Sequence, residues 1–159
     1  MKKEKPLYQT KDFTVRRSQV PNAGYGLYVN RPFQKGESLG PYKGKLLTME
    51  ECNQDKYLPL WGHMLDMTGI EGIEPYVALH PSISMVLRYI NHAPTSLNGK
   101  KISGKKSINV EFNQIDRHPY IEIRAIRDIE SGDEVFLNYG KGFTNMFMRM
   151  NKDLKNFYK

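Results

Sequence analysis

The chain has 159 residues, and its 24 Lys and Arg outnumber its 17 Asp and Glu, which gives a formal net charge of +7. This length suits one compact domain that folds without crosslinks. A single cysteine, Cys52, excludes a disulfide framework and a multi-cysteine zinc cluster. No apolar run approaches the roughly 20 residues of a membrane-spanning helix. The N-terminus is basic and no apolar stretch follows it, so we expect no secretory signal peptide. The positive net charge of the chain favours acidic partners.

The first half of the chain alternates turn signals with short apolar runs. Residues 1–12 are basic and polar, and we expect them to form a tail. A turn at 22–26 precedes Leu27-Tyr28-Val29, which predicts a strand. Thr48 with Glu51 three residues later is a capping-box pattern and predicts a helix over 49–57. The stretch 61–79 carries no clear period.

The second half contains more alternating segments. Residues 84–91 are mostly apolar and indicate a buried turn of helix. Apolar residues at every second position predict further strands, and a hairpin connection at 116–119 separates them. A turn at 131–133 leads into a strand over 134–137. Ile108, Val110, Phe112, Ile121 and Ile123 are the alternating apolar residues. Many short strands with few long helices predict a mostly β fold.

The C-terminal segment has a helical period. Phe147, Met150, Leu154 and Phe157 lie three or four residues apart, which is typical of an amphipathic helix. We therefore expect a domain over 13–143 and a short helix over 144–159 that packs on the domain or caps its site.

Three motifs carry polar chemistry, and each alone has an ordinary explanation. Gly24-Tyr25-Gly26 lacks the third glycine of a dinucleotide site and fits a tight turn equally well. Asn91 and His92 end an apolar segment, where a satisfied buried pair is as reasonable as a ligand site. Tyr139 follows a strand, where packing is commoner than catalysis. The chain has no HExxH zinc motif and no serine nucleophile elbow.

In combination the motifs are specific. The chain contains, in order, GYGLY, YKG, RYINHA, NVEF and IRAIRDIESGDEVFLNYG. This series resembles the SET domain of protein lysine methyltransferases over roughly 13–143. The resemblance implies several small curved sheets with a C-terminal pseudoknot and few short helices. It also implies methyl transfer from S-adenosylmethionine to a lysine ε-amine of a histone tail or another basic protein.

The resemblance assigns roles to individual residues. It implies that Tyr139 is catalytic through orientation and electrostatics, because the amine must attack as a neutral group. It implies that Glu134 supports the pseudoknot. Tyr42, Leu137 and Phe143 would line the lysine channel. The cofactor would contact Gly24, Tyr25, Gly26, Arg88, Tyr89, Asn91 and His92.

Departures from the family pattern lead to further expectations. No cysteine follows Cys52, so we expect no metal and a cap on the lysine channel built without zinc. Leu137 stands where the family often has Phe or Tyr, and its smaller side chain leaves room for products beyond monomethyl-lysine.

The sequence is compatible with several partners, cellular locations and functions. Lys100, Lys101, Lys105 and Lys106 lie in an insert that is either a solvated loop or a contact for nucleosomal DNA or an acidic protein surface. If the substrate is a histone, the protein acts in the nucleus, either of its own cell or of a host cell. If the substrate is another protein, we expect it to act in the cytoplasm. The alternatives are a catalytically silent SET-like module that binds protein or nucleic acid, and a generic basic nucleic-acid-binding domain.

Overall fold

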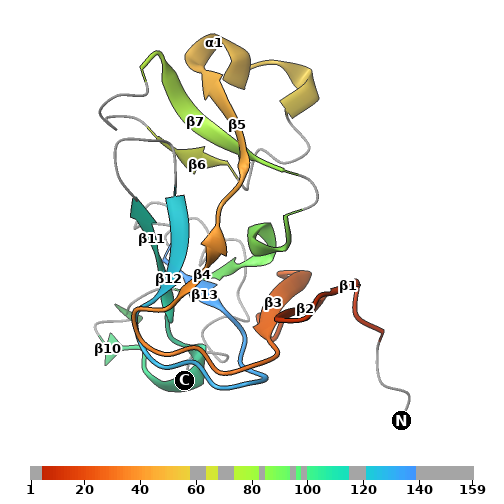
Figure 1. The fold of residues 1–159 in the computed structure, drawn as a ribbon, viewed down its shortest axis with the longest axis vertical. Coiled ribbons are helices and arrows are strands. Elements are labelled where there is room, and N and C mark those ends of the chain that lie inside the picture. The colour runs from red at the N-terminus through yellow and green to blue at the C-terminus, as the bar shows by residue number, and fades with distance from the viewer. Residues whose placement is uncertain are drawn as a thin grey trace. The chain divides into compact units, whose positions relative to one another are not determined.

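The computed structural model describes residues 5–57, 64–67, 74–82, 85–93, 96–97, 100–114 and 121–138, and Figure 1 shows their strands and helices. The chain divides into two compact units, one within 1–37, 89–111 and 124–159 and one within 38–88 and 112–123. Short strands dominate both, which confirms the predicted mostly β fold. The expected hairpin at 116–119, the expected helix at 144–159, Tyr139 and Phe143 lie outside the described residues.

The first unit is built on the antiparallel sheet β1-β2-β3, whose strands lie side by side in Figure 1. They are β1 (Tyr8–Gln9), β2 (Phe13–Arg17) and β3 (Tyr25–Val29). The predicted tail was wrong at residues 8–9, because β1 pairs with β2 there. The strand predicted at 27–29 is confirmed and starts earlier. The segment 132–135 covers the other edge of β3, and the Val135 amide donates to Leu27 O at 2.8 Å.

Elements from distant parts of the chain complete this unit. The strands β8 (Asn91–His92) and β13 (Phe136–Leu137) pair in parallel. The strand predicted over 134–137 is shorter in the structure, where β13 covers only its last two residues. Glu134 forms an isolated β-bridge with Tyr28 instead. Asn109 is fully buried, donates from Nδ2 to Glu134 O at 2.9 Å and accepts the Phe136 amide at 2.8 Å. The remaining elements are β9 (Ser96–Leu97), β10 (Lys100–Lys101) and η3 (Gly104–Lys106).

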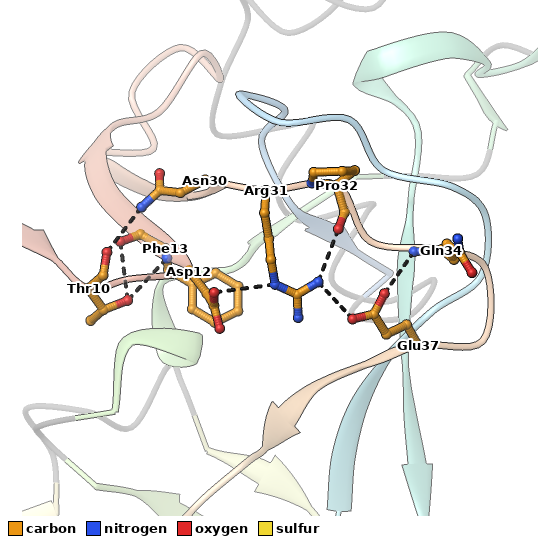
Figure 2. Close-up of polar contacts among 8 residues, drawn as sticks. All are labelled: Thr10, Asp12, Phe13, Asn30, Arg31, Pro32, Gln34 and Glu37. Carbon is orange, nitrogen blue, oxygen red and sulfur yellow. Dashed lines mark hydrogen bonds and ion pairs between the residues drawn. The ribbon is translucent and has the colours of Figure 1, made fainter.

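A polar network fixes the turn between β1 and β2 (Figure 2). The Arg31 guanidinium donates to Asp12 Oδ1 at 3.3 Å and to Glu37 Oε2 at 2.8 Å. The Gln34 backbone amide and then Arg31 lower the pKa of Glu37. Asn30 Nδ2 donates to Thr10 O at 3.1 Å. These contacts are partly exposed, so they define the turn more than they stabilise the fold.

The second unit contains the sheet β5-β7-β6, formed by β5 (Gly44–Thr48), β7 (Tyr76–Pro81) and β6 (Leu65–Asp66). The capping box at Thr48 is confirmed, because Thr48 Oγ1 accepts the Glu51 amide at 3.2 Å and the Glu51 carboxylate accepts the Thr48 amide at 3.1 Å. The helix that follows, α1 (Met49–Cys52), is shorter than predicted. It buries no residue, so packing does not extend it.

Three further strands form the sheet β11-β12-β4, with β11 (Val110–Gln114), β12 (Ile121–Ala125) and β4 (Ser38–Pro41). The boundary between the units falls within β11 and β12. Ile121 and Ile123 are buried as predicted, but Glu122 between them is buried too, and Ile108 lies before β11. The 3-10 helix η2 (Val86–Tyr89) confirms the predicted buried turn and buries Leu87 and Arg88. None of the described helices is long and apolar enough to cross a membrane.

Candidate functional site

The centre of the first unit's polar site is Glu134, whose side chain is 1% exposed. Its Oε2 accepts the Ser18 hydroxyl at 2.7 Å, and its Oε1 accepts the Gln19 amide at 2.9 Å. Asn91 Nδ2 lies 3.4 Å from Oε2. One buried carboxylate therefore joins the segment before β3 to the start of β8, and the sequence separation is more than 100 residues for Ser18. Such bonds to a charged acceptor are the strong kind.

The two glycines of the first motif are needed for different reasons. A Cβ on Gly26 would collide with the Glu134 carboxylate, so this glycine allows the close approach of β3 and Glu134. Gly24 instead has φ +74, which favours glycine, and a Cβ there would meet no heavy atom of the described residues within 4 Å. Backbone conformation, rather than close packing, therefore favours glycine at this position.

Asn91 links this turn to β8. Its Nδ2 donates to Tyr25 O at 3.0 Å and also reaches Glu134. Because both contacts use the nitrogen, the amide oxygen is the group that can accept a hydrogen bond from a ligand ammonium. The structure thus brings together Tyr25, Gly26, Asn91 and Glu134, which the sequence analysis singled out separately.

His92 is a buried neutral group. Burial lowers the pKa of its side chain from 6.5 to about 4, although a hydrogen bond to the Leu137 backbone acts in the opposite direction. The side chain is only 2% exposed. The imidazole therefore ties β8 to β13 next to Leu137, which is also buried.

Arg88 and Tyr89, which adjoin in sequence, differ in surroundings. Tyr89 is half-buried, and its ring lies 6.0 Å from that of Tyr8. Arg88 is buried in the second unit, where its charge lowers the pKa of Tyr42. Burial outweighs this effect and raises the pKa of Tyr42, so its phenol is neutral at pH 7. The Tyr42 and Phe112 rings pack edge to face, and their centroids lie 5.6 Å apart.

Tyr42 borders an open groove of about 610 Å³ in the second unit. The groove is lined by Tyr42, Lys43, Gly44, Lys45, Leu46, Tyr76 and Leu79. The register pairs Leu46 with Leu79, so their side chains share one face of the sheet. Within the described strands β5 is an edge of its sheet, because only β7 pairs with it.

The basic insert is partly tied to the first unit. Lys105 Nζ lies 3.0 Å from Glu130 and 3.2 Å from Asp133, so its charge is already paired. Lys100 and Lys101 are exposed on β10. Arg127 holds the loop that follows Lys101 in the chain by donating to Gly104 O and Ser107 O. Among the described residues, no group of His, Cys, Asp and Glu is placed to hold a metal ion.

Sequence reasoning missed the residues that hold the motifs in place. Ser18 and Gln19 bind Glu134 from more than 100 residues away in sequence, so no local pattern indicated this contact. Asn109 was also missed. Its signal is a polar amide between Ile108 and Val110, in a run whose neighbours are apolar.

Several known proteins are similar to this chain in sequence or in structure. Residues 24–140 match the family profile of the SET domain. The chain is 27% identical over 148 residues to "Histone-lysine N-methyltransferase EZH2" of Chaetomium thermophilum, a match that covers 88% of this chain and 9% of that protein. It is also similar to a solved structure, "Humanized mutant of the Chaetomium thermophilum Polycomb Repressive Complex 2 bound to the inhibitor GSK126". That match has a TM-score of 0.57 and 28% identity, and it covers 83% of this chain and 15% of the other.

Proposed function

Because the chain belongs to the SET domain family, we propose that it is an S-adenosylmethionine-dependent protein-lysine N-methyltransferase. The observation that carries the proposal is the arrangement of Tyr25, Asn91 and Glu134 beside the Gly24 turn. A silent binding module has no need of Asn91, His92 and Tyr139 together.

The methyl-donor site lies in the first unit. We assign the backbone of 24–26 and the backbone of His92 to its walls, with Tyr89 beside them. Asn91 Oδ1 accepts a hydrogen bond from the ammonium of the donor's methionine part. Arg88 is assigned a supporting role through its place in the motif. When bound, S-adenosylmethionine supplies an electrophilic methyl group on a positively charged sulfur.

The peptide site lies along the groove of the second unit. Among the described strands only β7 pairs with β5, and an extended peptide can add to the other edge of β5 by backbone hydrogen bonds. Tyr42 is neutral and buried, and its ring is suited to packing on the aliphatic stem of a lysine. Where an aromatic channel excludes water, it disfavours the ammonium form of the lysine, which promotes the neutral amine that must attack.

Tyr139 is the residue we assign to orient the amine during transfer. We assign Phe143 to the wall of the lysine channel. Leu137 carries no hydroxyl that would hold a water molecule, so we propose that products beyond monomethyl-lysine form. Mass spectrometry with excess methyl donor tests this point, and a product that stops at monomethyl-lysine contradicts it.

The substrate class follows from the relatives. The matched protein is named a histone-lysine N-methyltransferase, so we propose a histone or similar basic protein as substrate and chromatin in a nucleus as its place. The exposed Lys100 and Lys101 are the proposed nucleosome contact, whereas Lys105 contributes less because it is paired. DNA affinity that falls steeply with salt is the expected signature.

The test is methyl transfer from labelled S-adenosylmethionine to histones, nucleosomes and ribosomal proteins, with wild type and Tyr139→Phe compared. Calorimetry measures donor binding in both. We expect label transfer by wild type only, with donor binding retained in the variant. The alternative, a silent module that binds through its basic surface, predicts no donor binding by wild type.

A further inference from the structure

The N-terminal strand β1 precedes the part of the chain that matches the SET family, yet it contacts a motif residue. The matched region begins at residue 24. Tyr8 in β1 has its ring 6.0 Å from the ring of Tyr89, at an interplanar angle of 45°. This is within the range of favourable aromatic pairs. Tyr89 lies two residues before Asn91, the residue that links β8 to the Gly24 turn.

The position of Tyr8 is fixed on both sides along the chain. Before it, the Leu7 amide donates to Val15 O at 2.8 Å. After it, Thr10 Oγ1 accepts the Phe13 amide at 3.1 Å, and Thr10 O accepts from Asn30, as Figure 2 shows. Such contacts on either side hold β1 in register and keep the Tyr8 ring against Tyr89.

The register also places Tyr8 on the same face of the sheet as Tyr25. Tyr8 lies opposite Val15, and Val15 lies opposite Leu27. Tyr25 precedes Leu27 by two residues, so its side chain points to the same face. Tyr8 and Tyr25 are 49% and 42% exposed, which is high for aromatic residues in strands. Val15 and Leu27, which lie on the same face, are fully buried, so Tyr8 and Tyr25 flank a buried part of this face. The Tyr25 carbonyl accepts a hydrogen bond from Asn91.

We infer that Tyr8 is a positioning residue of the methyl-donor site, an inference that rests on the proposed function. By packing on Tyr89, it restrains the short segment from Tyr89 to His92. The same segment is also held by Asn91, which donates to Tyr25 O, and by the pairing of β8 with β13, so Tyr8 adds one restraint to these. Loss of the Tyr8 ring removes this restraint on Tyr89 and weakens donor binding, while transfer from the bound donor proceeds as before. A merely structural edge strand would change stability without changing donor affinity.

The experiment measures the Kd of S-adenosylhomocysteine and S-adenosylmethionine by calorimetry, well below the unfolding temperature of each variant. Tyr8→Ala should bind about five- to tenfold more weakly, which is the scale of one aromatic pair. Tyr8→Phe keeps the ring and should stay within about twofold of wild type. Gln9→Ala is the matched control, because the neighbouring side chain points to the other face of β1. In kinetics, KM for the donor should rise with kcat unchanged.

A second background shows whether Tyr8 acts through Tyr89. In Tyr89→Leu protein, the further change Tyr8→Ala should have no added effect on Kd. The inference is overturned if Tyr8→Ala binds like wild type, or if it weakens binding equally in both backgrounds. Wild-type protein that binds neither ligand would instead overturn the proposed function, and the inference with it.

Discussion

The Glu134 site of the first unit and the β5-β7-β6 sheet of the second are held together in different ways. Around Glu134, side chains make hydrogen bonds to backbone or side-chain groups of distant segments, as Ser18, Gln19 and Asn109 show. In the sheet, a backbone ladder joins β5 to β7 along their length. The difference matches the proposed ligands. A donor of fixed shape suits a site built from satisfied polar groups, whereas a variable peptide suits an open strand edge.

The first prediction breaks the Glu134 site. Glu134→Ala removes the acceptor of the Gln19 amide and of the Ser18 hydroxyl, and both contacts are partly buried. A hydrogen bond to a charged acceptor contributes about 1.5–3 kcal/mol, so the loss of two such bonds should lower the free energy of unfolding by about 4 kcal/mol. Denaturant titration measures it. Glu130→Ala is the control, because this exposed carboxylate pairs only with exposed Lys105 among its described contacts. Equal losses in the two variants would contradict the role of Glu134.

The second prediction compares one glycine from each region. A Cβ on Gly44 in β5 would collide with the backbone oxygen of His80, and a Cβ on Gly26 with the side chain of Glu134. Backbone within a ladder moves less easily than a side chain. We therefore expect Gly44→Ala to cost about 3 kcal/mol and Gly26→Ala about 2 kcal/mol.

Gly24→Ala separates steric overlap from backbone strain. At this position a Cβ meets no heavy atom of the described residues within 4 Å and the positive φ opposes it, so the loss should be about 1 kcal/mol. Thermal and denaturant unfolding of the three alanine variants measure the series. If Gly26→Ala lost more free energy of unfolding than Gly44→Ala, the backbone of β5 would adjust to the added methyl group more easily than the Glu134 site does.

Sequence could predict the parts of the structure that local patterns determine. The capping box at Thr48, the buried turn at 86–89 and the burial of Ile121 and Ile123 are of this kind. The order of motifs also predicted the family. Partners distant in sequence could not be found this way. Nothing near Ser18 points to Glu134, and β1 looked like a tail because its two residues pair only through β2.

The third prediction uses the pKa of His92, which folding lowers from 6.5 to about 4. Between these values the unfolded chain binds a proton that the folded chain does not. Stability therefore falls as the pH drops from about 6.5 to about 4, and the loss is complete below that range. A shift of this size corresponds to about 3 kcal/mol.

A variant without the imidazole isolates this contribution. His92→Asn will be less stable than wild type at pH 7, and the difference between the two should shrink as the pH falls to 4. Groups common to both proteins cancel in this comparison. Denaturant unfolding at each pH gives the two curves. Parallel curves across the range would show that His92 does not titrate as its burial implies.

The smallest expected effect tests the open groove of the second unit, and it rests on the proposed function. Tyr76 lines the groove and is 39% exposed, so Tyr76→Ala should hardly change the free energy of unfolding. It removes one aromatic face from the peptide site, and KM for a peptide substrate should rise about fivefold with kcat unchanged. Met49→Ala is the control, since Met49 is 65% exposed in the same unit without lining the groove. A KM equal to that of wild type would place the peptide elsewhere, whereas a fall in kcat alone would assign Tyr76 to the transfer step rather than to binding.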